Sequence, residues 1–374
     1  MRPDATRLRS DDRGVTLSIA GLDRFFSWSW LRDHARDDGS YHADSEQRLV
    51  PLATSTTIGP GTTIEPGTPV IADHRLRVTW PDGSTTHLPL QLLGDVDAPS
   101  QMYDTFAESQ QPWTGVELAS RVATVDAEGF VNDDELLAFV LDRLRRDGVV
   151  IVEDVDVDVT ATRRVLERFG YVRMSIFGDV WTFGSDGVLD DTASTSLDIE
   201  PHTDGTYSAD APGMLALHCL RRATGGASVV VDGLTVARRL ATEDATSAEM
   251  LRTTEIPGRY VGDGAHLVAW RPVLRHEHGR LAQVSYNHHD RAPFVLPEPE
   301  MTDVYRALRR FHDLTARTEL RYEFTLEPGQ MLLIDNWRVL HGRQAFAGER
   351  RMAGGYVNRE DIESRVRTLA GAAT

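Results

Sequence analysis

Short apolar strands separated by loops fill most of the second half of the sequence, and this pattern restricts the possible folds more than any other feature. Two helical stretches interrupt it, Asp232–Thr242 and Glu298–Ala316. Upstream, the spacing of apolar residues predicts a helix over Asn132–Arg146, with Asn132 as its cap. A buried strand, Gly148–Val152, and a second helix, Thr160–Gly170, follow. This order predicts a β core supported by helices, which is an α+β fold.

The N-terminal part has a different pattern. Gly14–Gly21 and Leu76–Trp80 alternate polar and apolar residues, and Pro81–Ser84 has the composition of a turn. We therefore predict a small β-rich domain over residues 1–95. Residues 96–118 are polar and contain prolines, which indicates a linker or an arm packed across the next domain. Residues 119–374 are expected to form that larger domain.

Charge and cysteine usage limit the partners and the setting. The formal net charge of −17 disfavours binding to nucleic acid or to anionic membranes, because phosphate binding needs clusters of Lys and Arg. We see no apolar run long enough for a membrane helix and no apolar signal segment near Met1. Cys219 is the single cysteine, which excludes an internal disulfide and a cysteine-rich zinc site. A reducing, cytoplasmic setting is the simplest interpretation.

A pair of possible metal ligands lies in the segment Leu197–Tyr207. His202 and Asp204 are two residues apart, so on an extended strand both side chains point to the same face. A third ligand is available from His341, which follows the apolar segment Met331–Ile334. Two imidazoles and one carboxylate suit Fe(II) and leave coordination positions open. The His-x-Asp pair alone is weak evidence, since it also occurs by chance in surface turns.

Two arginines follow His341 in the sequence. Arg350 and Arg351 come nine and ten residues after it. A guanidinium at this place can hold the far carboxylate of a 2-oxo diacid in a bidentate pair. In isolation, a turn with solvated arginines explains the same residues.

Taken in order along the chain, these motifs resemble the γ-butyrobetaine hydroxylase and trimethyllysine hydroxylase branch of the TauD-like oxygenases. The resemblance covers nearly the whole chain and is most specific in its C-terminal motifs. The matching motifs are Trp30–Asp33, Trp80–Gly83, Phe169–Gly170, Phe177–Gly178, His202–Asp204, Pro212–Gly213, Leu217–Cys219, Gly225–Gly226, Val231–Gly233, Asp335–Arg338, Leu340–Arg343, Arg350 and Gly355–Tyr356.

The resemblance implies a double-stranded β-helix, or jelly-roll, catalytic domain behind a small N-terminal domain. It implies Fe(II) bound by His202, Asp204 and His341, with 2-oxoglutarate on the iron and its far carboxylate on Arg350. Arg350, not Arg351, has the family's spacing to the C-terminal Gly-Tyr motif. Ser228 matches a position that assists the same co-substrate. The implied reaction uses O2, converts 2-oxoglutarate to succinate and CO2, and hydroxylates an unactivated C–H bond of a small molecule. A homodimer is also implied.

The small domain departs from the family. γ-Butyrobetaine enzymes carry zinc-binding cysteines just after the Trp-Leu-Arg-Asp motif, and here Asp33–His42 contains none. The remaining histidines do not make up the four ligands of a structural zinc site. We therefore predict that this domain holds no structural zinc.

The substrate site also departs from the family. The resemblance places the trimethylammonium cage at Phe177, Trp181, Ser194 and Tyr356, and Ser194 stands where a tyrosine is expected. Asn287 is expected to face the substrate. The incomplete cage favours a small amine-bearing or zwitterionic metabolite over γ-butyrobetaine itself. Two alternatives stay open: a quaternary-ammonium hydroxylase with a variant cage, and a catalytically silent 2-oxoglutarate-binding protein on the same fold.

Overall fold

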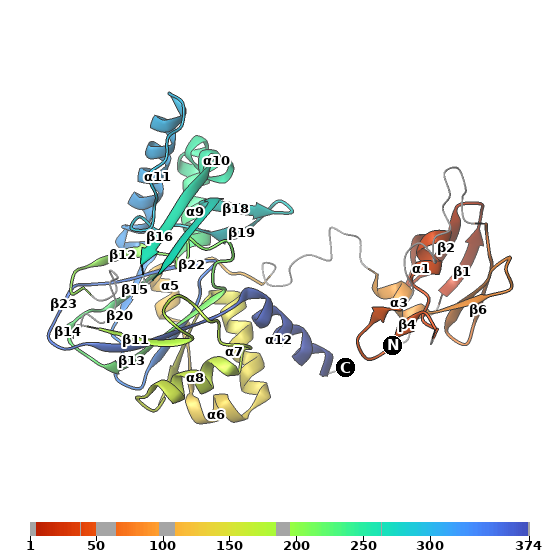
Figure 1. Ribbon diagram of the computed structural model, residues 1–374, viewed down its shortest axis with the longest axis horizontal. Coiled ribbons are helices and arrows are strands. Elements are labelled where there is room, and N and C mark those ends of the chain that lie inside the picture. Colours follow the sequence, from red (N-terminus) through yellow and green to blue (C-terminus); the bar gives the residue numbers. More distant parts are fainter. Residues whose placement is uncertain are drawn as a thin grey trace. The chain divides into compact units, whose positions relative to one another are not determined.

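The computed structural model describes residues 5–37, 39–49, 65–96, 109–184, 195–262 and 264–372. The chain divides into two compact units, Met1–Tyr103 and Asp104–Thr374, and each is described by itself (Figure 1).

The first unit is built mainly from antiparallel strands. One sheet has the order β1-β2-β3 and another the order β6-β7-β8. Alternate residues of these strands point inward, as in β2 where Val15, Leu17 and Ile19 are buried, and form one core with the two short helices. The elements are β1 (Ala5–Ser10), β2 (Gly14–Ile19), β3 (Leu22–Ser27), α1 (Trp28–Asp33), β4 (Tyr41–His42), β5 (Gln47–Arg48), β6 (Thr68–Ala72), β7 (Arg75–Thr79), β8 (Thr85–Pro89) and α3 (Leu90–Asp95).

Two sheets form the centre of the second unit. The six-stranded sheet has the order β11-β24-β13-β21-β10-β9, and the four-stranded sheet has the order β12-β22-β15-β20. All strand pairs in them are antiparallel except the parallel pair of β9 and β10. The strands are β9 (Ala123–Asp126), β10 (Val149–Glu153), β11 (Val180–Gly184), β12 (Ile199–His202), β13 (Met214–Arg221), β15 (Ser228–Asp232), β20 (Arg321–Phe324), β21 (Met331–Asp335), β22 (Val339–Arg343) and β24 (Arg351–Val357).

Helices cover the outer face of each sheet (Figure 1). Val150 and Val152 of β10 pack on one side with α6, α7, α8 and α12, and Val149 and Ile151 face the other side. On that other side, the two sheets share one core, to which Val230 of β15 belongs. The outer face of the four-stranded sheet packs on α9 and α11. These helices are α6 (Ala127–Asn132), α7 (Asp134–Asp147), α8 (Val159–Glu167), α9 (Gly233–Glu243), α10 (Ala245–Thr253), α11 (Glu300–Thr315) and α12 (Arg359–Ala372).

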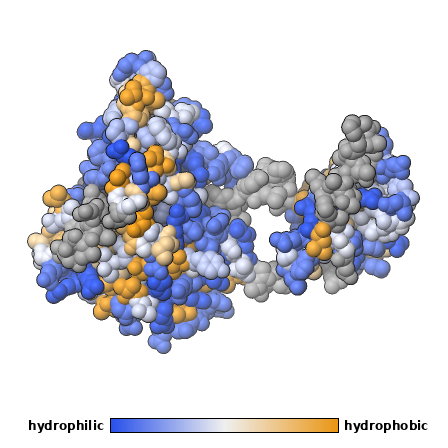
Figure 2. All heavy atoms as spheres, viewed as in Figure 1, coloured by the Kyte–Doolittle hydropathy of each residue, from blue (hydrophilic) through white to orange (hydrophobic). Residues whose placement is uncertain are grey.

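The remaining elements are short or peripheral. The strands β16 and β17 form a long hairpin whose exposed residues include Val261, Val268 and Trp270. Figure 2 shows mostly hydrophilic side chains on the visible face of the second unit, with hydrophobic residues gathered in patches. The elements are α5 (Gly115–Ala119), β14 (Thr224–Gly225), β16 (Glu255–Gly262), β17 (Ala265–Pro272), β18 (Leu274–Glu277), β19 (Arg280–Val284), η2 (Thr318–Leu320) and β23 (Phe346–Ala347).

One predicted helix has a different start in the structure. Asn132 is the last residue of α6, and Asp133 caps α7 by accepting a hydrogen bond from the Glu135 N–H at 2.8 Å. Aspartate and asparagine cap helices about equally well, so composition alone did not separate the two. In the described part of the chain, no helix is long and apolar enough to cross a bilayer.

Candidate metal and substrate site

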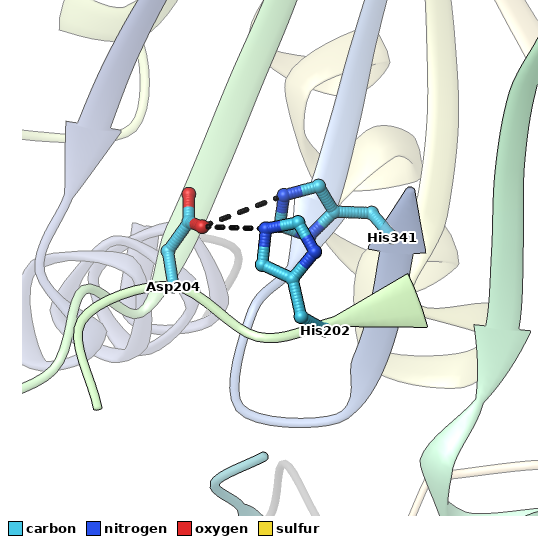
Figure 3. A group of neighbouring side chains, drawn as sticks. All are labelled: His202, Asp204 and His341. Atoms are coloured by element: carbon cyan, nitrogen blue, oxygen red, sulfur yellow. Dashed lines mark ion pairs between the residues drawn. The ribbon is translucent and has the colours of Figure 1, made fainter. Parts of the chain in front are cut away.

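Three side chains from two distant segments of the sequence meet at the edge of the four-stranded sheet. His202 ends β12 and pairs in register with His341 on β22. Asp204 follows in the loop after β12, and its Oδ1 lies 3.4 Å from His202 Nε2 and 3.5 Å from His341 Nε2. Figure 3 shows both imidazoles directed at this carboxylate. The strand pairing therefore brings together the three residues that the sequence analysis selected.

The loop that carries Asp204 is held by backbone geometry and by a buried amide. Gly205 has φ +73°, and a Cβ there would lie 2.7 Å from Pro212 Cδ, so the turn after Asp204 needs glycine. Asn336 Oδ1 accepts a hydrogen bond from the Asp204 N–H at 2.8 Å. The Asn336 Nδ2 donates to the Asp204 and Pro212 carbonyls at 3.1 and 2.9 Å. These contacts fix the carboxylate relative to both imidazoles.

The polar groups around the three residues set their charge states. His202 Nδ1 lies 2.8 Å from the Glu200 carbonyl and donates to it, which directs Nε2 toward the other two residues. Burial lowers the pKa of His341 to about 4, so this imidazole is neutral at pH 7. Burial opposes ionisation of Asp204, but the two imidazoles and the Tyr356 hydroxyl lower its pKa well below the usual value. Burial opposes protonation of His202, but the Asp204 carboxylate raises its pKa above the usual value. A divalent cation bound here would take the place of that proton, because a ligating imidazole must be deprotonated.

A cavity of about 120 Å³ opens onto these residues from between the two sheets. Every site residue selected from the sequence lines it except Ser194, which lies outside the described residues. Its walls come from the inner faces of both sheets and from the loops next to them. The selected residues in its lining are Phe177, Trp181, His202, Asp204, Ser228, Asn287, His341, Arg350 and Tyr356.

Aromatic rings form one wall of this cavity. Trp181 lies between Phe177 and Tyr356, with ring centroids 5.6 and 4.7 Å away. Tyr260 packs edge-on against Phe177 at 6.0 Å and contacts Tyr207 at 5.3 Å. Tyr207 and Tyr260 were missed by the sequence analysis. Tyr207 is only three residues after Asp204 and was within reach of that motif, but Tyr260 lies on β16 and nothing in its spacing pointed to the site.

Tyr356 has a second role that the sequence analysis did not foresee. Its ring belongs to the aromatic wall, and its hydroxyl donates to Asp204 Oδ2 at 2.8 Å. The same side chain therefore contacts both the candidate substrate space and the candidate metal ligand.

The two adjacent arginines have different environments. Arg350 lines the cavity, and burial lowers the pKa of its guanidinium. Arg351 is exposed at the start of β24. Arg343 also lines the cavity, but its guanidinium donates to the Leu197 carbonyl at 2.7 Å and to the Thr195 carbonyl. Arg350 is therefore the better placed of the adjacent pair to meet an anion in the cavity.

A buried ion pair supports the segment that leads to His341. Arg338 Nε donates to Asp232 Oδ1 at 2.8 Å, and both side chains are almost fully buried. Asp232 also accepts the Trp113 N–H at 3.0 Å, which ties the segment before α5 to the end of β15. Arg338 further donates to the carbonyls of Gln111 and Arg146, both at 2.7 Å. The Asp-Asn-Trp-Arg motif thus holds the loop between β21 and β22 in place.

The three meeting residues suit one ferrous ion. Their candidate ligand atoms all lie within 4.8 Å of one another, and no other such group was found in the described residues. Two imidazole nitrogens and one carboxylate oxygen match the donor set of non-haem Fe(II) oxygenases, which leaves further positions open. The His202 and His341 rings lie 4.5 Å apart between centroids and are tilted by 44°, so little movement is needed to share a cation. The absence of structural zinc in the first unit stays a prediction.

Comparison with known families decides the class. Residues 110–356 match the model of the taurine catabolism dioxygenase TauD, TfdA family. The chain belongs to this family. Trimethyllysine dioxygenase of Gallus gallus is 33% identical over 92% of this chain and 83% of the relative, and that of Homo sapiens is 31% identical over 92% and 82%. The predicted family, enzyme class and cofactors are thereby confirmed. This TauD-family protein is an Fe(II)- and 2-oxoglutarate-dependent dioxygenase that uses O2.

Solved structures agree with this fold. A putative α-ketoglutarate-dependent taurine dioxygenase from Burkholderia xenovorans superposes with a TM-score of 0.50 over 66% of this chain and 91% of its own, at 15% identity. At this identity the likeness concerns the fold alone. The second unit of the TauD-family chain is accordingly a mixed arrangement of sheets and helices of the TauD type.

Proposed function

We propose that this dioxygenase hydroxylates a small amino acid that carries a methylated ammonium group, in the cavity between the two sheets. The observation that carries the proposal is the aromatic wall of Phe177, Trp181 and Tyr356, which faces the cavity opened by the candidate metal ligands. Ring faces attract methylammonium groups by cation–π interaction. The curated relatives named trimethyllysine dioxygenase act on a compound of this class, as their name says.

Within this proposal, His202, Asp204 and His341 hold Fe(II). When bound, iron with 2-oxoglutarate and O2 supplies an oxidant for an unactivated C–H bond, with release of succinate and CO2. The chain's own residues bind and orient the reactants. Arg350 pairs with the far carboxylate of 2-oxoglutarate, and Ser228, buried on the facing strand, assists that contact.

The remaining cavity residues position the substrate and limit access of water. Phe177, Trp181 and Tyr356 surround the methylated ammonium, and Tyr260 extends this wall. Asn287 faces the same space, where its amide can bind a carboxylate or an amine. Apolar side chains of the six-stranded sheet, such as Phe183, Leu215 and Leu217, line the cavity as well. A site with such walls keeps a reactive centre away from bulk solvent.

The domain assignment belongs to the same proposal. Residues 119–374 form the catalytic domain, residues 96–118 a linker or an arm, and residues 1–95 a small domain without zinc. The catalytic domain is a double-stranded β-helix. This is supported by two largely antiparallel sheets that share one core and have the candidate ligands on β12 and β22 at one edge. The cytoplasmic setting and the homodimer stay predictions.

The proposal is tested by succinate formation with three candidate substrates. We expect trimethyllysine to stimulate Fe(II)-dependent succinate release well above the rate without substrate, with lysine and γ-butyrobetaine less effective. A mass increase of one oxygen in the product must accompany this release. Stimulation by γ-butyrobetaine alone would support the variant-cage alternative. Absence of turnover with every methylated amine, while 2-oxoglutarate binds, would contradict the proposal and favour a silent protein.

The hydrogen bond from the Tyr356 hydroxyl to Asp204 gives a separate prediction. In Tyr356→Phe, Asp204 Oδ2 loses a hydrogen bond of 2.8 Å, so the carboxylate is less well oriented toward the metal. Partners that orient metal ligands typically contribute about 10- to 100-fold to affinity, and we expect a loss of about 10-fold here. The dissociation constant for Mn(II), measured by electron paramagnetic resonance, checks this without turnover.

Tyr171→Phe serves as the matched control. Tyr171 is 83% exposed, so the same loss of one hydroxyl there is expected to leave Mn(II) binding unchanged. Equal affinities of the two variants would contradict a supporting role for Tyr356 at the metal site.

A further inference from the structure

Asp290 is a charged residue of the cavity to which the proposed function assigns no role. The described lining contains four side chains with a formal charge at pH 7, namely Asp204, Asp290, Arg343 and Arg350. The proposal assigns Asp204 to the metal and Arg350 to 2-oxoglutarate. Arg343 is directed at two backbone carbonyls that precede β12. Of the two carboxylates in the described lining, Asp290 is the one outside the candidate metal ligands.

The position of Asp290 is fixed from two sides. Thr206 Oγ1 donates to Asp290 Oδ2 at 3.1 Å, and Thr206 is buried two residues after Asp204. The Asp290 carbonyl accepts a hydrogen bond from the Arg259 N–H at 2.8 Å, and Gly258 pairs with Arg291 as an isolated bridge. The carboxylate is thus tied to the metal-ligand loop, and the Asp290 backbone is tied to β16, the strand that carries Tyr260. Its place in the cavity is set before any substrate binds.

The chemistry of this carboxylate indicates what it binds. An ionised carboxylate accepts about four hydrogen bonds and donates none, so it can accept from the Thr206 hydroxyl and from further donors at the same time. Its charge also repels anions in a partly enclosed space. A quaternary ammonium has no N–H to donate and is better matched by the aromatic wall. A primary ammonium offers three donors and the opposite charge.

We propose that Asp290 binds a primary ammonium group of the substrate and so selects amino acids over the same compounds without the amino group. This inference rests on the proposed function, because it assigns the methylated ammonium to the aromatic wall. In this role, Asp290 determines substrate specificity and takes no part in C–H oxidation.

The test compares two pairs of probes that differ only in the α-amino group. The pairs are trimethyllysine with its deaminated analogue, and lysine with its deaminated analogue. The anaerobic Fe(II)- and 2-oxoglutarate-loaded enzyme is titrated with each probe by calorimetry, and KM and kcat are measured for those oxidised. The wild type is expected to bind the amino member of a pair about 10- to 100-fold more tightly. In Asp290→Asn this preference should fall to about 3-fold or less, with kcat nearly unchanged.

Asp142→Asn is the matched control, because Asp142 is an exposed residue of α7 on the helical layer outside the six-stranded sheet. It should keep the wild-type preference, and Asp290→Glu should keep part of it. If Asp290→Asn does not fold, Asp290→Ser replaces it. Equal weakening of both members of a pair, an unchanged preference, or no binding of any probe to the wild type would overturn the role of Asp290. Amino-dependent binding of lysine without oxidation of trimethyllysine would refute the proposed function alone.

Discussion

Asp204→Ala is expected to abolish succinate formation and hydroxylation, with a loss of about 100-fold or more in kcat/KM. The variant removes the only carboxylate among the three proposed ligands and the charge that offsets that of the metal. It also leaves the Tyr356 hydroxyl without the acceptor that it has at 2.8 Å. Rates of succinate release, together with Mn(II) binding followed by electron paramagnetic resonance, measure both effects.

Asp210→Ala is a suitable control for this variant. Asp210 lies on the same segment as Asp204, but its carboxylate is exposed and pairs with Arg173. We expect near-normal Mn(II) affinity and activity from the control, and circular dichroism should show that both variants are folded. Normal hydroxylation by Asp204→Ala would refute the assignment of the metal ligands.

Arg350→Met is expected to raise the KM for 2-oxoglutarate by about 100-fold, which corresponds to about 3 kcal/mol for a charged, bidentate hydrogen-bonded pair. Arg350 lines the cavity, where burial makes its guanidinium a stronger partner for a carboxylate than a solvated one. Methionine keeps much of the side-chain volume and removes the charge together with the N–H donors. The KM for 2-oxoglutarate is measured at saturating substrate.

Arg351→Met is the matched control, since it makes the same change one residue further on, at an exposed position of β24. We expect its KM for 2-oxoglutarate to stay within about 3-fold of the wild type. A large effect in Arg351→Met and none in Arg350→Met would reverse the assignment of the two arginines.

Much of the local structure was predictable from patterns of apolar residues. β10 was expected over Gly148–Val152 and is observed at Val149–Glu153. The prediction succeeded because this strand is buried on both faces and its sequence is therefore a continuous apolar run. The helix expected over Glu298–Ala316 is α11, because apolar residues recur at helical spacing there. α10, Ala245–Thr253, was missed. Its mixture of alanine, threonine and serine gives a weak helical signal, and packing against α11 stabilises it.

The candidate site was predictable only in part. His202 and Asp204 share one motif, and His341 and the Arg350–Arg351 pair were candidates from the residues. The resemblance to the TauD family then favoured His341 as the third ligand and Arg350 over Arg351. Tyr260 gave no such signal, because the hairpin that carries it has no fixed spacing to the metal motif. The cage was expected to be incomplete at Ser194, and the aromatic wall has an additional ring from Tyr260.

The sequence by itself determined which groups are available for chemistry: two imidazoles, a carboxylate and an arginine in a family-specific order. These residue types in that order suffice because the donor atoms a ferrous ion needs are few and chemically distinct. Tertiary structure alone decided which side chains share a space. Pairing of β12 with β22 brings His202 within reach of His341, and the fold directs Arg350 inward and Arg351 outward. It also places Asp290 in the cavity, since proximity between distant segments depends on strand register and packing, which no short motif encodes.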